Sequence, residues 1–196
     1  MLGDCGTNKA MATPRPRKTK PPLDEAKLNE LALRYVGRFA TSRAKFRSYL
    51  QRKVRERGWS GCVPPDPDGL VERLAGLGYV DDREFALAKA RSLTSRGYGR
   101  ERLRQALAVA GIGDEEAADA REIADAGAIE SALRFARRKR FGPYSREQAD
   151  VRERERALAS MVRAGHAFAL ARAIIDLDPG EGDDPQILSD LQNRFT

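Results

Sequence analysis

GYVDDREFA, residues 78–86, is the stretch that best defines the fold of this chain. Asp81 is a residue type favoured at helix N-caps, and Glu84 follows three residues later, as in a capping box. Val80 and Phe85 occupy the two positions of a hydrophobic staple around that cap. The stretch therefore predicts a helix that begins at Asp81.

The same stretch contains two adjacent carboxylates, Asp81 and Asp82, which allows a second interpretation as a catalytic or metal-binding dyad. The chain has a single histidine, and it lies far from the pair in the sequence. A helix cap accounts for both residues without any chemistry, so we predict that the pair is structural.

Features of this region recur along the chain. The dipeptide Ala-Leu occurs at 32–33, 86–87 and 132–133, and each unit then has a glycine that ends its second helix, at Gly58, Gly111 and Gly165. Apolar residues recur at spacings of three and four, and strand-like alternation is absent. We therefore predict an all-α fold of tandem three-helix repeats: repeat 1 over 23–78, repeat 2 over 79–126 and repeat 3 over 127–177. Because such short units bury little surface alone, they should stack into an elongated, curved rod.

The two ends of the chain differ from this body in composition. Residues 1–22 hold five Lys or Arg, one Asp and four Pro, which predicts a disordered basic arm. Residues 178–196 hold five acidic residues against Arg194, with helix-breaking Pro and Gly, which predicts an acidic flexible tail. Met11 is an alternative start to Met1.

Basic residues dominate the body of the chain. The formal net charge is +7, although the tail is acidic. The segment 42–57, the surroundings of the glycine turn 97–99 and the segment 134–140 are each strongly basic. A single basic run is usually a solvated face, but recurrence in all three repeats indicates a stripe suited to phosphates or an acidic groove. The candidate binding residues are Arg43, Lys45, Arg47, Arg52, Lys53, Arg55, Arg91, Arg96, Arg100, Arg104, Arg134, Arg137, Arg138, Lys139 and Arg140.

The third repeat is expected to depart from the other two. Ser145 and Gln148 have the spacing of a capping box, before a helix over 146–164 whose alternating Arg and Glu should pair with one another. The segment 166–177 is apolar almost all round and should be buried. His166 at its start is interpreted as a helix-terminus residue and not as a ligand.

No motif for catalysis or cofactor binding is found. The chain has no phosphate-binding loop, no dinucleotide fingerprint, and no Ser, Cys or Lys nucleophile in a recognisable local motif. Cys5 and Cys62 match no metal-ligand spacing. We therefore expect no catalytic residue, no metal and no cofactor, and a binding protein that is not an enzyme.

The GYVDDREFA stretch also resembles the signature of the RecX regulatory proteins. The likeness extends through the basic helix that follows, GYGRERL at 97–103, Leu107 and the pair Gly111-Ile112, with Leu103 where the family usually has Ile. It covers about residues 24–177. The resemblance implies tandem three-helix repeats and a regulator that binds the helical groove of the RecA–DNA filament and restrains the recombinase.

Two other functions are compatible with the same residues. One is a general DNA-binding helical protein with no dedicated protein partner, and the other is a helical-repeat scaffold for an unrelated acidic protein. Single-stranded DNA is a further candidate ligand. No apolar run is long enough to span a membrane, and the N-terminus lacks the apolar core of a secretory signal, so a cytoplasmic monomer is expected.

Overall fold

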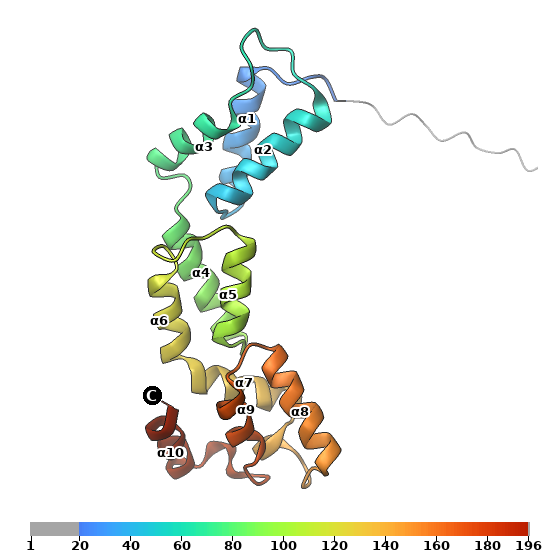
Figure 1. Cartoon of the computed structure of the whole chain (residues 1–196), viewed down its shortest axis with the longest axis vertical. Helices are drawn as coiled ribbons and strands as arrows, with labels where there is room; N and C mark the ends of the chain where they lie inside the picture. The colour runs from blue at the N-terminus through green and yellow to red at the C-terminus, as the bar shows by residue number, and fades with distance from the viewer. Residues whose placement is uncertain (1–19, 196) are drawn as a thin grey trace, which may run out of the picture.

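The computed structural model describes residues 20–195, which fold into an elongated, curved stack of helices (Figure 1). Within this range the secondary structure is helical, apart from one isolated bridge between Leu23 and Trp59. The helices are α1 (Glu25–Val36), α2 (Arg43–Arg57), α3 (Pro67–Gly76), α4 (Asp82–Ser95), α5 (Arg100–Val109), α6 (Ala118–Ala126), α7 (Ala128–Lys139), α8 (Val151–Arg163), α9 (Phe168–Ile175) and α10 (Pro185–Phe195), with short 3-10 turns η1 (Gly142–Tyr144) and η2 (Glu181–Asp183). The predicted all-α fold is confirmed.

Three separate hydrophobic cores divide the stack. The first is built by α1–α3, the second by α4–α6, and the third by α7–α9 together with α10. In the first core Phe46 and Leu50 of α2 are fully buried, and burial of side chains of this size contributes about 1.5–3 kcal/mol each. Val80 packs in the first core, although the sequence placed it in the second repeat.

Side-chain caps begin four of the helices, including α4 at the predicted Asp81. The carboxylates of Asp24, Asp66 and Asp81 accept hydrogen bonds from backbone N–H groups three residues later, at 2.8–3.0 Å. The hydroxyl of Ser42 caps α2 in the same way, accepting from the N–H of Lys45 at 3.3 Å. These caps satisfy N–H groups that have no partner within their own helices.

The start of α8 was predicted wrongly. The helix begins at Val151, and its capping box is formed by Asp150 and Glu153. The hydroxyl of Ser145 instead donates to the carbonyl oxygens of Gly142 and Glu147, at 2.8 and 2.7 Å. Ser145 is thus the C-cap of η1, and its hydroxyl serves the turn that follows.

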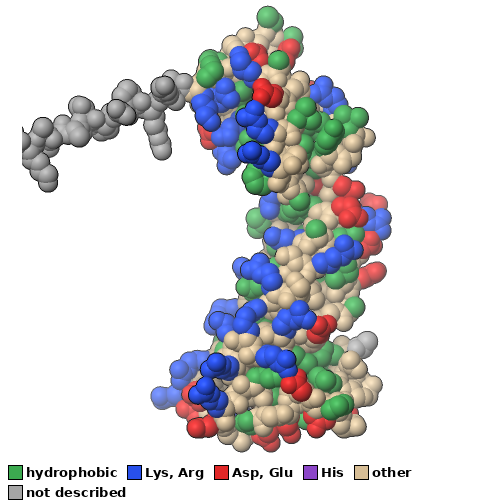
Figure 2. Space-filling model, turned by 180° about the vertical axis from the view of Figure 1, so that it is seen from behind, with side chains coloured by type: hydrophobic (Ala, Val, Ile, Leu, Met, Phe, Trp, Pro, Cys, Tyr) green, Lys and Arg blue, Asp and Glu red, His purple; other side chains and the backbone are tan. Residues whose placement is uncertain are grey.

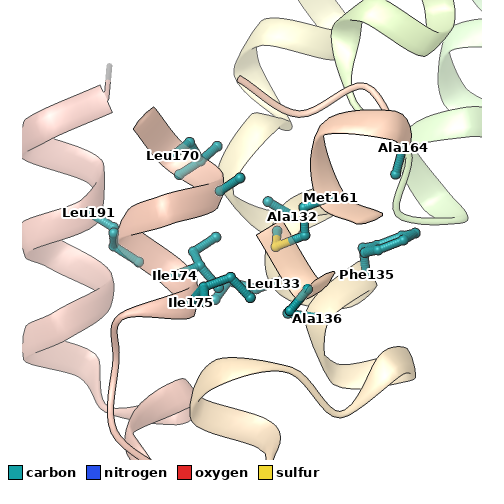
Figure 3. Packing of buried hydrophobic residues seen from close by; sticks show 12 residues of the cluster. Ala132, Leu133, Phe135, Ala136, Met161, Ala164, Leu170, Ile174, Ile175 and Leu191 are labelled. Atoms are coloured by element: carbon teal, nitrogen blue, oxygen red, sulfur yellow. The ribbon is translucent and has the colours of Figure 1, made fainter. Parts of the chain in front are cut away.

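The predicted acidic flexible tail over 178–196 is also corrected. Residues 185–195 form α10, and Leu191 is buried in the third core (Figure 3). Ile187, Leu191 and Phe195 recur every four residues, so α10 has an apolar face that the acidic composition of the whole segment conceals. The segment between α9 and α10 also contacts the third repeat. Gly180 donates its N–H to the carbonyl oxygen of Pro143, and Tyr144 donates its hydroxyl to the carbonyl oxygen of Gly182.

The basic arm predicted over residues 1–22 lies outside the described residues, apart from its last three. One of these is held in place: the guanidinium of Arg57 donates two hydrogen bonds, of 2.9 and 2.7 Å, to the carbonyl oxygen of Pro21. These bonds tie the chain at Pro21 to the C-terminal end of α2.

The middle helices of the three repeats, α2, α5 and α8, are joined end to end. The N-terminus of α2 contacts the C-terminus of α5, where the Ser42 hydroxyl donates to the Ala110 carbonyl at 2.5 Å. The N-terminus of α5 contacts the C-terminus of α8, where Gly99 and Glu101 donate their N–H groups to Ala164 and Gly165 at 3.0 and 3.1 Å. We call α2, α5 and α8 the middle-helix column; their dipoles point the same way along the stack (Figure 1).

Candidate nucleic-acid interface

The structure places the predicted basic residues on four helices and on the C-caps of two of them. Six lie on α2, two on α5, two on and just after α4, and five on α7 and its C-cap: Arg43, Lys45, Arg47, Arg52, Lys53, Arg55; Arg100, Arg104; Arg91, Arg96; Arg134, Arg137, Arg138, Lys139, Arg140. They form two groups, one on the middle-helix column and one where α4 meets α7.

Lys and Arg side chains follow the column edge of the molecule from the first repeat to the third (Figure 2). Acidic side chains gather on the opposite edge at the level of the second repeat, where α6 and the loop before it carry Asp114, Glu115, Glu116, Asp119, Glu122 and Asp125. The surface is therefore divided by charge across the width of the stack, which favours approach of an anionic partner from the column side.

Most of the predicted column arginines have acidic partners within the chain. Arg43 and Arg47 of α2 reach α3, where Arg47 pairs with Asp68 at 2.5 Å and Arg43 with Glu72 at 3.4 Å. On α5, Arg104 pairs with Glu101 at 2.6 Å, a hydrogen bond that lowers the pKa of the Glu101 carboxyl. The pairs are exposed, so they contribute little stability and can yield to a phosphate.

Lys45 and Arg55 have no ion pair within residues 20–195. The ammonium of Lys45 lies 5.3 Å from the ring centre of Phe85, across the contact between the first and second repeats. Lys45 is part of the column and has no ion pair within residues 20–195. It is therefore a stronger candidate for binding an anionic partner than Arg43 or Arg47.

The prediction that α8 neutralises itself is wrong for the part of the chain that the structure describes. The carboxylate that Arg154 approaches belongs to Asp176, at 3.9 Å, and the guanidinium of Arg156 donates to the backbone carbonyl of Arg152. Alternating charge in the sequence did not produce Arg–Glu pairs within the helix. Because α8 continues the column, we add three of its arginines to the candidate surface, Arg152, Arg156 and Arg163. We also add Arg102 of α5.

The second basic group closes the C-terminus of α4. The guanidiniums of Arg134 and Arg138 on α7 donate to the carbonyl oxygens of Ser95, at 2.9 Å, and Arg96. Arg96 and Arg138 both lie over the ring of Tyr98, at 5.4 and 5.8 Å. These cations sit where the carbonyl end of a helix favours positive charge, so part of their role is structural.

Two further predicted residues differ from their neighbours on α7. Arg137 pairs with Asp183 of η2, and its guanidinium lies 5.0 Å from the ring centre of Tyr144. Its charge is therefore neutralised by the acidic segment that contains η2. Arg140 ends α7 in the left-handed conformation, with φ of 58°. It is the one positive-φ residue other than glycine among those described.

Asp81 and Asp82 each have a structural partner. Asp81 caps α4, and a carboxylate oxygen of Asp82 accepts the N–H of Arg43, the first residue of α2, at 2.9 Å. Burial raises the pKa of the Asp82 carboxyl, and the Arg43 hydrogen bond acts in the opposite direction. The two carboxylates therefore cap two helices in different repeats, and the structure gives them no shared geometry for chemistry.

His166 is buried between the second and third repeats. Its Nε2 lies 3.2 Å from the carbonyl oxygen of Gly97, and its ring packs 5.7 Å from that of Phe135. Burial lowers the pKa of the imidazole. The residue precedes α9, as predicted, but its burial in a contact between repeats could not be read from the sequence.

No metal centre is found among residues 20–195, where no group of three His, Cys, Asp or Glu side chains converges. No helix in that range is both long enough and apolar enough to cross a membrane.

The fold and this surface define a class: a tandem three-helix-repeat protein with a basic edge along its middle helices. Comparison with known proteins agrees. Residues 81–120 match the family model described as RecX, second three-helix domain. A regulatory protein RecX from Myxococcus xanthus is 34% identical over 176 residues, covering 84% of this chain and 90% of the relative. A second, from Agrobacterium fabrum, is 27% identical and covers 74% of this chain and 79% of the relative.

The chain belongs to the RecX family of regulatory proteins. Solved structures share its fold. The crystal structure of RecX from Lactobacillus salivarius aligns with a TM-score of 0.59 at 17% identity, covering 86% of this chain and 96% of the other. A second RecX crystal structure aligns with a TM-score of 0.55 at 21% identity, covering 77% and 71%.

Proposed function

We propose that this protein is a cytoplasmic, non-enzymatic regulator of the RecA recombinase. In this proposal the monomer lies in the helical groove of the RecA–DNA filament, with the middle-helix column facing the filament, and opposes its extension or activity. The partner comes from the RecX resemblance, and the binding surface comes from the charges of the column.

The alignment of three helices with unpaired cations along one edge is the observation that carries the proposal. End contacts join α2 to α5 and α5 to α8, and Lys45, Arg102 and Arg156 are cations on these three helices that have no ion pair within residues 20–195. A helical nucleoprotein filament repeats its phosphates at regular intervals along its length. An extended set of cations can match such a repeat, and a single basic helix cannot.

The polar groups that would be candidates for catalysis support a binding role. Asp81, Asp82 and His166 each take part in a contact that holds helices or repeats together. Using any of them in a reaction would require the loss of that contact.

The test compares two triple variants with the same change in net charge. Lys45→Gln, Arg102→Gln and Arg156→Gln remove cations from the column. Arg73→Gln, Arg83→Gln and Arg121→Gln remove the same charge from α3, α4 and α6 and serve as the matched control. We expect the column variant to bind RecA-coated single-stranded DNA at least tenfold more weakly and with a shallower salt dependence, and the control to bind like the unmodified protein.

Arg43 and Arg47 are left out of this test, because their ion pairs with α3 make them weaker candidates than Lys45. The control residues are partnered as well, Arg73 with Asn29, Arg83 with Asp119 and Arg121 with Asp114, so thermal unfolding must show that both variants stay folded. Equal binding by the two triple variants would contradict the column as the interface. If the column variant loses affinity for bare DNA and for RecA-coated DNA by the same factor, the result would favour the general DNA-binding function.

A further inference from the structure

A groove between α1 and α2 combines aromatic rings with cations. It has a volume of about 950 Å³ and is lined by residues of α1 and α2 and of the segments next to them. The cationic side chains around it are Lys20, Lys27, Arg34, Arg38, Lys53 and Arg57, and the two carboxylates are Glu30 and Glu56. The groove is therefore strongly basic.

The aromatic rings form a stack that leads from the core to the surface. Tyr35 lies parallel to the buried Phe46 and is stacked on Tyr49, with ring centres 4.0 Å apart. Phe39 packs against the other side of this group, 5.4 Å from Tyr35, and is 56% exposed. Phe39 is the ring that a flat ligand can reach, and the rings behind it fix its position.

The cations near this stack are unevenly neutralised. Arg34 pairs with Glu30 and Lys53 with Glu56, each at 2.5 Å. Arg38, adjacent to Phe39, has no ion pair within residues 20–195. A ligand seated on Phe39 would thus meet a cation whose charge is unpaired.

We propose that this groove binds single-stranded nucleic acid, with a base stacked on Phe39 and the neighbouring phosphates on Arg38 and the other cations. Rings with accessible faces beside cations are the arrangement that takes unpaired bases, and a duplex cannot offer its base faces to Phe39. The residues that precede Lys20 carry four Lys or Arg against one Asp, so charge disfavours them as the occupant.

A second hollow continues the path of such a strand toward the column. It has a volume of about 480 Å³ and is lined by Tyr35 and Tyr49 together with Lys45, Arg52 and Val109. The same two tyrosines therefore border both hollows. A strand that begins at Phe39 can run over them to the junction of the first and second repeats.

This inference goes beyond the proposed function, because the ligand is the nucleic acid itself and RecA is not required. Its failure would leave the filament proposal standing, since that test uses RecA-coated DNA and leaves Phe39 unchanged.

The experiment compares an oligothymidylate of about 15 nucleotides with an abasic deoxyribose-phosphate chain of equal length, by fluorescence anisotropy at low salt. We expect the full-length protein to prefer the oligothymidylate by at least about fivefold. Phe39→Ala should abolish that preference, and Phe39→Trp should retain it. Circular dichroism confirms that each variant keeps its helicity.

Phe168 provides the matched control. It is also 56% exposed, but the hollow beside it holds Arg172 and Arg194 against Asp176 and Asp190, so it is not basic. Phe168→Ala should leave the preference unchanged. Equal binding of the two oligomers by the unmodified protein, or a preference that survives Phe39→Ala, would overturn the proposal. Displacement of the oligothymidylate by a polyglutamate peptide that itself loses affinity on Phe39→Ala would assign the groove to acidic peptides instead.

Discussion

The junction between the first and second repeats differs from the junction between the second and third in the groups that cross it. At the first, side chains make the hydrogen bonds, from Ser42 to Ala110 and from Arg43 to Asp82. At the second, the column itself is joined backbone to backbone, where Gly99 and Glu101 donate to Ala164 and Gly165. Side chains of Arg134, Arg138 and His166 add bonds to the carbonyls of residues 95–97 beside it. The same column geometry is therefore built in two ways.

The packing around the two junctions follows the same division. Tyr98 contacts both the second and the third core, so apolar packing continues across the second junction. Within the described residues, the first and second cores have no such shared residue. Within residues 20–195, every hydrogen bond across the first junction involves a side chain, whereas the second adds direct backbone-to-backbone bonds to its side-chain bonds.

Gly99→Ala should have the largest effect on this comparison. Gly99 has φ of −86°, which alanine adopts freely, but a Cβ there would fall on the carbonyl of Gly165. We expect the free energy of unfolding to fall by about 1–3 kcal/mol, because backbone must move apart. Urea unfolding followed by circular dichroism measures this change.

Gly76→Ala is the control, because a Cβ at Gly76, in α3, meets open space. It should be neutral or stabilising by up to about 1 kcal/mol. Equal effects of the two substitutions would mean that the second junction opens without cost.

Ser42→Ala should have the next largest effect. It removes a cap from α2 and leaves the buried Ala110 carbonyl without its partner across the first junction, a loss of about 1–3 kcal/mol. Asp66→Ala removes an exposed cap that contacts no other repeat and should cost about 1 kcal/mol. If Asp66→Ala proves as costly as Ser42→Ala in urea unfolding, the bond to Ala110 contributes nothing to the junction.

Acid should weaken the second junction by a smaller amount. Burial lowers the pKa of His166, so the unfolded chain takes up its proton first as the pH falls below about 6.5, and stability falls with it. The unmodified protein should lose more thermal stability between about pH 7.5 and about pH 5.5 than His166→Gln, which keeps a donor for Gly97. No other histidine exists in the chain to give the same signal. An equal loss of thermal stability in both proteins would show that protonation of His166 does not weaken the second junction.

Local signals in the sequence were sufficient for most of the fold. Asp24, Ser42, Asp66 and Asp81 identify helix starts because a cap needs only its own next three residues. The Ser145 prediction failed because the same hydroxyl can serve a turn. The segment 178–196 was misjudged because its composition was averaged, although Ile187, Leu191 and Phe195 carry a helical period.

The candidate surface was harder to predict, because it depends on contacts between repeats. The sequence located the basic segments, but it could not show that Arg43 and Arg47 turn toward α3, or that Arg134 and Arg138 close α4. It also treated α8 as self-neutralised. Only the end-to-end contacts show that α8, which carries Arg156, follows α5 and α2, which carries Lys45, along the stack.

The disassembly of RecA filaments on single-stranded DNA is the measurement that tests the central claim most directly. The unmodified protein should accelerate net disassembly at concentrations below those at which it binds bare single-stranded DNA. The column variant with Lys45, Arg102 and Arg156 changed to Gln should lose this effect, and the variant of Arg73, Arg83 and Arg121 should keep it. Disassembly that is unaffected until bare DNA is saturated, or that is accelerated equally by the column variant, would contradict the account.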